Sequence, residues 1–353
     1  MSKSNGYIAN MCMMANVRAY FLFRQRKEFK TIFDDLNNHQ FQPINGDAKL
    51  IAEKSLAFFT KLHNLWIFVI TPYCQLVKRI QYRRNIRETF SSFRRTNTLK
   101  SKDAVSTTVK HALTVISLMA CVSSITTPIF YSKNGGLPVA AWYPFNISFK
   151  PNHGLVYFHQ TIAIFYESLV NIETDVLASG LFTFIGIQCD FLCYKLSNGS
   201  DSNIKNYVQD YQRIRKIAKS CENIFSTIYF FQFFATTSGL CMTLFLLTLV
   251  QPYTFEFFFL VVYQAAVFNL LLVPSWFSSE IRRKSENIPV AAYCYPWVDA
   301  TKSMKRDLAF FIQNTQKPIQ LKALSFFNLS LEIFLKIVQS SFSYYTMLKK
   351  IST

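Results

Sequence analysis

Hydrophobic residues in this chain are gathered into blocks of about 20 residues, and polar stretches rich in Lys and Arg separate the blocks. A helix rises about 1.5 Å per residue, so about 20 apolar residues match a hydrocarbon core of about 30 Å. Six blocks are therefore predicted to cross a membrane as helices: 56–77, 112–131, 155–195, 224–250, 255–277 and 323–348. The predicted fold class is all-α, a polytopic membrane helical bundle.

The six blocks differ in how cleanly they fit a bilayer. The block 56–77 is the weakest, because Lys61, His63 and Asn64 interrupt it. The block 155–195 is longer than a bilayer is thick, and it carries Glu167, Glu173 and Asp175, so part of this helix is expected outside the lipid. A short turn around Gln251-Pro252-Tyr253 is expected to join the fourth and fifth blocks.

Composition and charge support the membrane interpretation. The 353 residues are 50% hydrophobic and include 36 Phe, which argues against a disordered chain, a disulfide-rich miniprotein or an ordinary soluble enzyme. The formal charge of +18 raises the alternative of nucleic-acid binding. However, ten of the Lys and Arg residues lie in 78–110, five in 196–223 and eight in 278–322, all between apolar blocks. This distribution is typical of cytoplasmic segments under the positive-inside rule, and no nucleic-acid partner is expected.

The same rule predicts most of the topology. With the three basic stretches in the cytoplasm, 132–154 and the turn at 251–253 lie outside, and the C-terminus is extracellular. Asn146 begins an Asn-Ile-Ser glycosylation sequon in the predicted outer loop, which agrees with this orientation.

The positive-inside rule gives no consistent topology for the N-terminal part of the chain. Residues 24–54 contain six Lys and Arg and are predicted to be cytoplasmic, yet one crossing by 56–77 would then place 78–110 outside. Three explanations stay open: residues 7–23 form a further crossing despite Arg18, the block 56–77 is interfacial, or a basic unit is duplicated. The last rests on a weak similarity between 26–33 and 83–90.

Other function classes find little support in the sequence. The eight Cys are scattered, and although Cys189 and Cys193 share a helix face, small core residues are a better interpretation than a metal site. The five His residues form no recognisable catalytic spacing, so we expect neither an enzyme nor a cofactor. A secondary transporter would need Gly and Pro breaks in paired helices, but only nine Gly are present. A G-protein-coupled receptor would show Asp-Arg-Tyr and Asn-Pro-x-x-Tyr, and neither occurs.

The C-terminal third carries a specific combination of motifs. They are Ala291-Ala292-Tyr293 with Trp297, then Gln316-Lys317-Pro318, then Ser330-Leu331-Glu332 with Phe334 and Lys336, and finally Ser341-Phe342-Ser343-Tyr344. In this combination the chain closely resembles the insect odorant receptor family. Looser similarity extends upstream to about residue 81, through Leu137-Pro138, Trp142-Tyr143-Pro144, Gln160, Asp175 and Gln188. The family has seven crossings and a cytoplasmic N-terminus, whereas only six blocks are found here.

The resemblance implies an odorant-gated, non-selective cation channel that detects volatile small molecules. Such receptors assemble as heterotetramers with a shared coreceptor, and this chain resembles the tuning subunit because 196–223 is too short for a coreceptor insertion. The implied location is the plasma membrane of an olfactory neuron dendrite. The alternatives kept open are a heptahelical G-protein-coupled chemoreceptor and a nonfunctional, truncated or duplicated family member.

The last block shows a polar stripe that gives the resemblance a physical basis. Lys336, Ser340, Ser343 and Met347 are spaced four, three and four residues apart, so they share one helix face. Polar residues within a span face a water-filled path or a protein interior, so the stripe either lines a pore or packs against neighbouring helices. Matching the family motif places Met347 and Ile351 at a hydrophobic gate, of the kind that closes by dewetting.

The resemblance also divides the chain into four regions. Residues 1–55 form an N-terminal region, 56–277 a helical bundle with the ligand pocket, 278–322 a cytoplasmic anchor region with Tyr293, Trp297 and Pro318, and 323–353 the pore-lining helix. An odorant pocket is expected to be apolar and aromatic, in the outer half of the bundle. Its candidate residues are Met119, Val122, Ile125, Tyr157, Phe158, Thr161, Phe165, Phe259 and Tyr263.

Overall fold

The computed structural model describes residues 150–199 and 203–352, together with 17, 18, 20, 21, 24, 25, 28, 32, 119, 122, 125, 126, 137, 138, 143 and 145. Its elements run in the order α7 (Lys150–Ser197), α8 (Ile204–Leu249), α9 (Phe255–Tyr293), α10 (Lys302–Thr315), β1 (Lys322–Ala323), β2 (Phe327–Asn328) and α11 (Leu331–Ser352). The predicted all-α bundle is confirmed, apart from a single two-stranded hairpin in the described residues.

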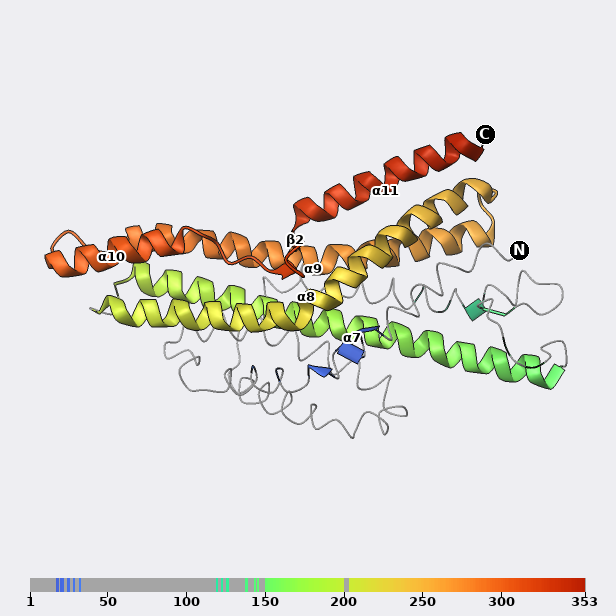
Figure 1. Cartoon of the computed structure of the whole chain (residues 1–353), viewed down its shortest axis with the longest axis horizontal. Coiled ribbons are helices and arrows are strands. Elements are labelled where there is room, and N and C mark those ends of the chain that lie inside the picture. Colours follow the sequence, from blue (N-terminus) through green and yellow to red (C-terminus); the bar gives the residue numbers. More distant parts are fainter. Residues whose placement is uncertain are drawn as a thin grey trace.

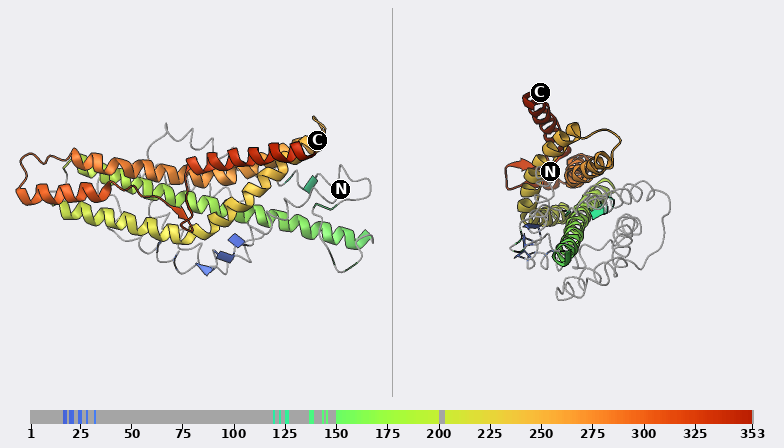
Figure 2. Two further views of the ribbon diagram at one scale, coloured as in Figure 1. Left: turned by 45° about the horizontal axis from the view of Figure 1, so that its top comes forward. Right: turned by 90° about the vertical axis from the view of Figure 1, so that its right-hand side faces the viewer.

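Three long helices form the centre of the molecule. The second half of α7, the first half of α8 and the second half of α9 lie side by side, and the core lies between them (Figure 1). Phe182 of α7 meets Phe225 of α8 edge to face, with ring centroids 5.8 Å apart, and Phe225 stacks on Tyr229 at the same distance. Towards the opposite end, the first half of α7 diverges from α8 and α9, as Figures 1 and 2 both show.

The turn between α8 and α9 lies where the sequence predicts it. Residues 250–254 connect the two helices, and Tyr253 takes a left-handed backbone with a φ of 65°. Thr254 caps α9, because its hydroxyl oxygen accepts a hydrogen bond from the backbone N–H of Phe257 at 3.2 Å. The short connection makes α8 and α9 antiparallel neighbours.

Two of the basic stretches expected between membrane blocks are largely helical. Helix α8 begins at Ile204, well before the apolar block at 224, and α9 continues through Pro289 to Tyr293. Buried residues recur at helical spacing in this part of α8, at Ile204, Tyr207 and Tyr211. The helices therefore extend beyond the apolar blocks and pack together there.

Three described helices are long and apolar enough to cross a membrane: Leu177–Ser197 within α7, and α8 and α9. Helix α11 is not among them, because Ser, Tyr and the charged Glu332 and Lys336 lower its hydropathy. It also begins at Leu331, later than the predicted start at 323. Figure 1 shows α11 at the edge of the bundle, where it contacts α8 and α9.

The residues just before α11 form the hairpin in place of a helical turn. β1 pairs with β2 antiparallel, with Ala323 opposite Phe327. Residues 324–326 form the turn, in which Leu324 and Ser325 have positive φ, 46° and 63°, and the N–H of Phe326 donates to the carbonyl of Ala323 at 3.0 Å. A helix from residue 323 is excluded because two consecutive left-handed residues break it.

Several predictions lie outside the described residues. They are the block 56–77, the sequon at Asn146 and the similarity between 26–33 and 83–90. The side chain of Ile351 is also outside them, although its backbone is in α11.

Candidate functional site

The N-terminal end of α7 makes polar contacts with the segments that precede it in the chain. The Tyr157 hydroxyl donates a hydrogen bond to the backbone carbonyl of Ile125 at 2.6 Å. One turn along, the Thr161 hydroxyl donates to the carbonyl of Tyr157 at 2.9 Å, and Gln160 donates to the hydroxyl of Tyr143 at 3.3 Å. Two of the predicted pocket residues, Ile125 and Tyr157, are thus brought into direct contact.

Six further predicted pocket residues fall into two groups. Four of them are exposed, in the block 112–131 or on α7: Met119, Val122, Phe158 and Phe165. By contrast, Phe259 and Tyr263 of α9 are buried and face each other with ring centroids 6.2 Å apart. Helix α7, which carries Phe158 and Phe165, and α9, which carries Phe259 and Tyr263, diverge towards this end (Figure 1).

Polar side chains join α8 to α9 within their apolar segments. The Gln232 amide, which is 1% exposed, donates to the carbonyl of Leu270 at 2.5 Å. Nearer the C-terminal end of α8, the Thr243 hydroxyl bonds to Gln264. Such bonds hold membrane helices together where no water can satisfy a polar group. The sequence analysis did not identify them, although Gln232 and Gln264 are amides inside otherwise apolar blocks, a signal it could have used.

Arg18 is buried against α7. Its side chain is 1% exposed, and Nη1 donates to the carbonyl of Asn171 at 3.0 Å and lies 3.5 Å from Asp175 Oδ1. A charged side chain at membrane depth is tolerated when it pairs with an opposite charge or a backbone carbonyl, and Arg18 has both partners. The charge that argued against a crossing by this segment therefore has a partner in the bundle.

Other described residues near Arg18 continue the same contact face. The Phe21 ring stacks on Phe231 of α8 at 6.4 Å, and the Gln25 amide donates to the carbonyl of Asn223 at 3.3 Å. From Phe21 to Gln25 the partner residues on α8 run backwards, from Phe231 to Asn223, and α8 is itself antiparallel to α7. The helical residues between 17 and 32 thus run parallel to α7 and antiparallel to α8.

Helix α11 has one packed face and one open face. Phe334 and Ser341 are buried, and the Phe334 ring meets Phe268 of α9 edge to face at 4.8 Å. The predicted stripe of Lys336, Ser340, Ser343 and Met347 is exposed along the helix. Lys336 Nζ lies 2.7 Å from Glu332 Oε1, so the stripe's one positive charge is paired within the helix. In this chain the stripe does not pack against neighbouring described helices.

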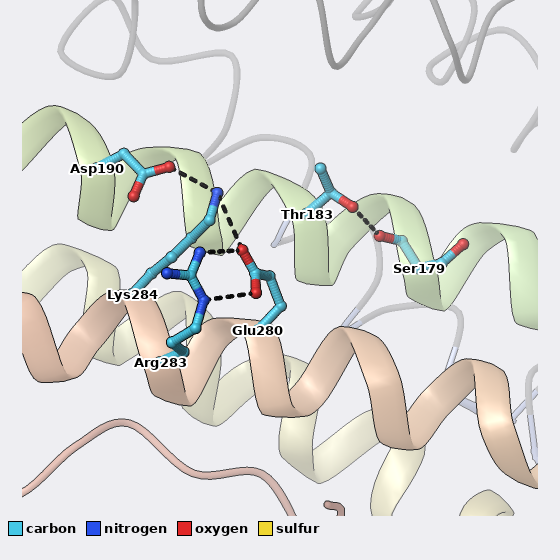
Figure 3. A network of polar contacts seen from close by, with 6 residues as sticks. All are labelled: Ser179, Thr183, Asp190, Glu280, Arg283 and Lys284. Carbon is cyan, nitrogen blue, oxygen red and sulfur yellow. Dashed lines mark hydrogen bonds and ion pairs between the residues drawn. The ribbon is translucent and has the colours of Figure 1, made fainter. Parts of the chain in front are cut away.

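A charged cluster joins α7 to the C-terminal part of α9 (Figure 3). Lys284 Nζ lies 2.6 Å from Asp190 Oδ2 on α7 and 3.9 Å from Glu280 Oε1 on its own helix. Arg283 binds both carboxylate oxygens of Glu280, at 2.6 and 2.9 Å. The cluster fixes the register of α9 against α7.

The predicted anchor residues lie close to this cluster's end of α9. The Trp297 indole N–H donates to the carbonyl of Tyr293 at 3.2 Å, and their rings are 6.4 Å apart. Tyr293 is 67% exposed, whereas Tyr295 is buried against Tyr207 of α8. Pro318 is half-buried in the extended segment after α10.

Comparison with known proteins connects this architecture to one family. The profile of the family described as 7tm Odorant receptor matches residues 54–342, which is most of the chain. The chain belongs to the odorant receptor family. The resemblance found in the sequence motifs is thereby confirmed.

Individual odorant receptors and solved structures show the same relationship. Odorant receptor 10 of Aedes albopictus is 25% identical over 250 residues, which cover 67% of this chain and 66% of that protein. Odorant receptor 46a, isoform A, of Drosophila melanogaster is 24% identical over 246 residues, covering 66% of this chain and 65% of that protein. The matched regions therefore span slightly less than two thirds of these relatives.

The fold is shared with the insect olfactory receptor OR5 from Machilis hrabei. That structure matches with a TM-score of 0.73 at 13% identity, covering 98% of this chain and 80% of the other. A second structure of that receptor, in complex with eugenol, matches with a TM-score of 0.64 at 15% identity, covering 96% of this chain and 88% of the other. The chain is thus a multi-pass membrane protein with the fold of an insect olfactory receptor.

Proposed function

We propose that this odorant receptor is the tuning subunit of an odorant-gated, non-selective cation channel, assembled with a coreceptor in a heterotetramer. The observation that carries the proposal is the open face of α11. Its polar stripe is exposed while the opposite face packs on α8 and α9, as expected of a helix whose second surface is completed by other subunits around a pore. Family membership supports the same conclusion.

The stripe has the chemistry that a cation pathway requires. Lys336 alone would repel cations, but its ion pair with Glu332 offsets that charge at the inner end of α11. Ser340 and Ser343 offer hydroxyls to a hydrated ion, and Met347, with the gate position at Ile351, supplies an apolar constriction that closes by dewetting.

The ligand is a volatile small molecule bound in the outer half of the bundle. Support comes from the aromatic and apolar residues there, which offer a mainly hydrophobic lining with few polar groups. Phe259 and Tyr263 contribute buried rings, and the Tyr157 hydroxyl is held by Ile125. Met119, Val122, Phe158, Thr161 and Phe165 remain candidates on the same side of the molecule.

The chain is oriented with its C-terminus and residues 132–154 outside the plasma membrane, in an olfactory neuron dendrite. The helical residues 17–32 run parallel to α7, so they pass from outside to inside and place the basic residues from Arg24 onward in the cytoplasm. The block 112–131 runs outward, since Ile125 near its end meets the outer end of α7. The chain is then cytoplasmic both after residue 32 and before residue 112, so it crosses the membrane an even number of times between these residues. A single crossing by the block 56–77 would not fit, which supports an interfacial position for this block.

Expression with a coreceptor in cells that lack other chemoreceptors tests the function. We expect volatile-evoked inward current that reverses near 0 mV in mixed Na⁺ and K⁺ and persists when G-protein signalling is blocked. Coreceptor alone is the control. A response abolished by the G-protein block would favour the heptahelical alternative. Absence of any response to a broad volatile panel, despite surface labelling of the chain, would count against the channel proposal.

A further inference from the structure

The segment that carries the chain into α11 is bound by three serine hydroxyls. The backbone N–H of Ile319 donates to Ser285 Oγ at 2.9 Å. In addition, the N–H of Leu324 donates to Ser226 Oγ at 2.6 Å, and the N–H of Leu331 donates to Ser279 Oγ at 2.9 Å. Ser226 lies on α8, and Ser279 and Ser285 lie on α9.

We define residues 316–330 as the strap. It is extended rather than helical, with Ile319, Leu321 and Ala323 buried at alternate positions. The strap folds back on itself, because the N–H of Leu329 donates to the carbonyl of Leu321 at 2.8 Å. The strap therefore forms a closed hairpin between the end of α10 and the start of α11.

Aromatic contacts hold the hairpin of the strap on α8. The Phe230 ring lies 5.3 Å from that of Phe326 and 6.3 Å from that of Phe327, and Phe233 lies 5.4 Å from Phe327. Contacts between rings tolerate sliding, so they do not fix the position of the strap along the axis of α8. The hydrogen bonds do fix this position, because their strength falls steeply with distance and angle.

The serine hydroxyls satisfy amides that regular structure leaves without partners. Leu331 is the first residue of α11, and the first four N–H groups of a helix have no partner within it. The Ile319 amide is buried, so losing its partner would leave a desolvated donor. Ser285 Oγ also donates to the carbonyl of Arg282 at 2.8 Å, which orients its acceptor towards the strap.

We propose that Ser226, Ser279 and Ser285 are positioning residues that couple α8 and α9 to the start of α11. This rests on the proposed function, in which α9 supplies pocket residues and α11 lines the pore. A displacement of α9 moves Ser279 and Ser285 with it, and their hydrogen bonds carry that displacement to Leu331 and Ile319. Ser226 holds the hairpin tip to α8, so a movement of α8 relative to α9 displaces the first residues of α11.

The chain supplies a matched control beside one of the three residues. Ser278 is 1% exposed, and its hydroxyl has no hydrogen-bond partner among the described residues. Ser278→Ala therefore removes a buried hydroxyl from the same turn of α9 without removing a bond to the strap. Ser279→Thr keeps a hydroxyl at the coupling position and serves as the conservative variant.

The first measurement is odorant-evoked current per receptor at the cell surface. We expect Ser279→Ala to shift the half-maximal odorant concentration by about two- to tenfold, the equivalent of one net hydrogen bond. Its maximal current per surface receptor should fall, while Ser278→Ala and Ser279→Thr should resemble the unsubstituted receptor. Equal behaviour of Ser279→Ala and Ser278→Ala in a responding receptor would overturn the proposal.

A second measurement is independent of channel function. Hydrogen exchange in the purified receptor should accelerate about two- to tenfold at the Leu331 amide in Ser279→Ala, and likewise at Ile319 in Ser285→Ala. Exchange should be unchanged in Ser278→Ala. Unchanged exchange in Ser279→Ala and Ser285→Ala would refute the hydrogen bonds of Leu331 and Ile319. A silent receptor with the expected exchange pattern would instead count against the proposed function.

Discussion

The side chain of Lys284 lies directly across Gly186, where a Cβ atom would stand 3.1 Å from Lys284 Cδ. The missing side chain on α7 lets Lys284 pass over the helix and reach Asp190 at 2.6 Å. The glycine and the ion pair are thus parts of one contact between α7 and α9, although neither is recognisable from the sequence.

This contact predicts different outcomes for two glycines in helices. Gly239 in α8 has open space around its Cβ position, so Gly239→Ala should raise stability by about 0.5–1 kcal/mol through helix propensity alone. Gly186→Ala should gain less, because Lys284 must shift, and Gly186→Val should lower stability. Thermal melting in detergent measures all three variants. Equal stabilisation by both alanine substitutions would show that Lys284 is not constrained by Gly186.

The buried pair of Arg18 and Asp175 predicts a strong effect of removing one partner. Arg18→Ala or Asp175→Ala should lower stability by about 3–5 kcal/mol, since an uncompensated charge stays buried. The double variant Arg18→Met with Asp175→Leu should recover much of that loss. Melting temperature and surface expression are the measurements.

The more exposed pair of Lys219 and Glu222 is the control for that experiment. Lys219→Ala should change stability by at most about 1 kcal/mol. If Arg18→Ala is equally mild, the N-terminal helical residues do not depend on the pair for their position.

The pairing of Glu332 with Lys336 predicts opposite effects on conductance. Glu332→Gln leaves Lys336 uncompensated at the inner end of the proposed pore, so single-channel cation conductance should fall. Lys336→Gln leaves Glu332 uncompensated, so conductance should rise. Both effects should weaken at high ionic strength, because exposed charges are screened. Identical conductance in both variants would place the pair away from the ion path.

The stripe on α11 makes a prediction about its apolar end. Met347→Ser should increase current in the absence of odorant, because a polar residue in a hydrophobic constriction favours its hydration. Phe342 is also exposed on α11 but lies off the stripe, so Phe342→Ser provides a matched control. Holding current per surface receptor is the readout, and equal increases in both variants would argue against Met347 as a gate residue.

The proposed orientation predicts glycosylation at the Asn146 sequon and none at the Asn198 sequon. Asn146→Gln should remove an enzyme-sensitive mobility shift on gels, whereas Asn198→Gln should leave it unchanged, because the proposal places Asn198 in the cytoplasm. An epitope tag before Met1 should be stained on intact cells if residues 17–32 run inward. Staining only after permeabilisation would reverse the direction proposed for that helix.

The features that the sequence predicted well depend on long, uninterrupted patterns. The apolar runs on either side of Gln251-Pro252-Tyr253 leave only one place for the turn between α8 and α9. The motif around Tyr293 and Trp297 is specific enough to indicate the family, which the comparisons confirm. In both cases many residues contribute to one signal.

Features that depend on a few distant residues were not predictable. The hairpin turn is formed by Leu324 and Ser325, which lack the Gly or Asn that normally indicates left-handed backbone. Arg18 looked like an obstacle to a membrane span because its partner Asp175 is far away in the chain. The extension of α8 to Ile204 was hidden by charged residues on its exposed face.

The contact between Arg18 and Asp175 also sets an order for biosynthesis. Translation adds about 5–20 residues per second, so the Arg18 segment emerges on the order of ten seconds before Asp175 exists. During that interval its guanidinium has no acidic partner in α7 and is poorly suited to remain in lipid alone. In the orientation that we propose, stable insertion of residues 17–32 therefore follows the synthesis of α7, which makes it a late step in the assembly of the bundle.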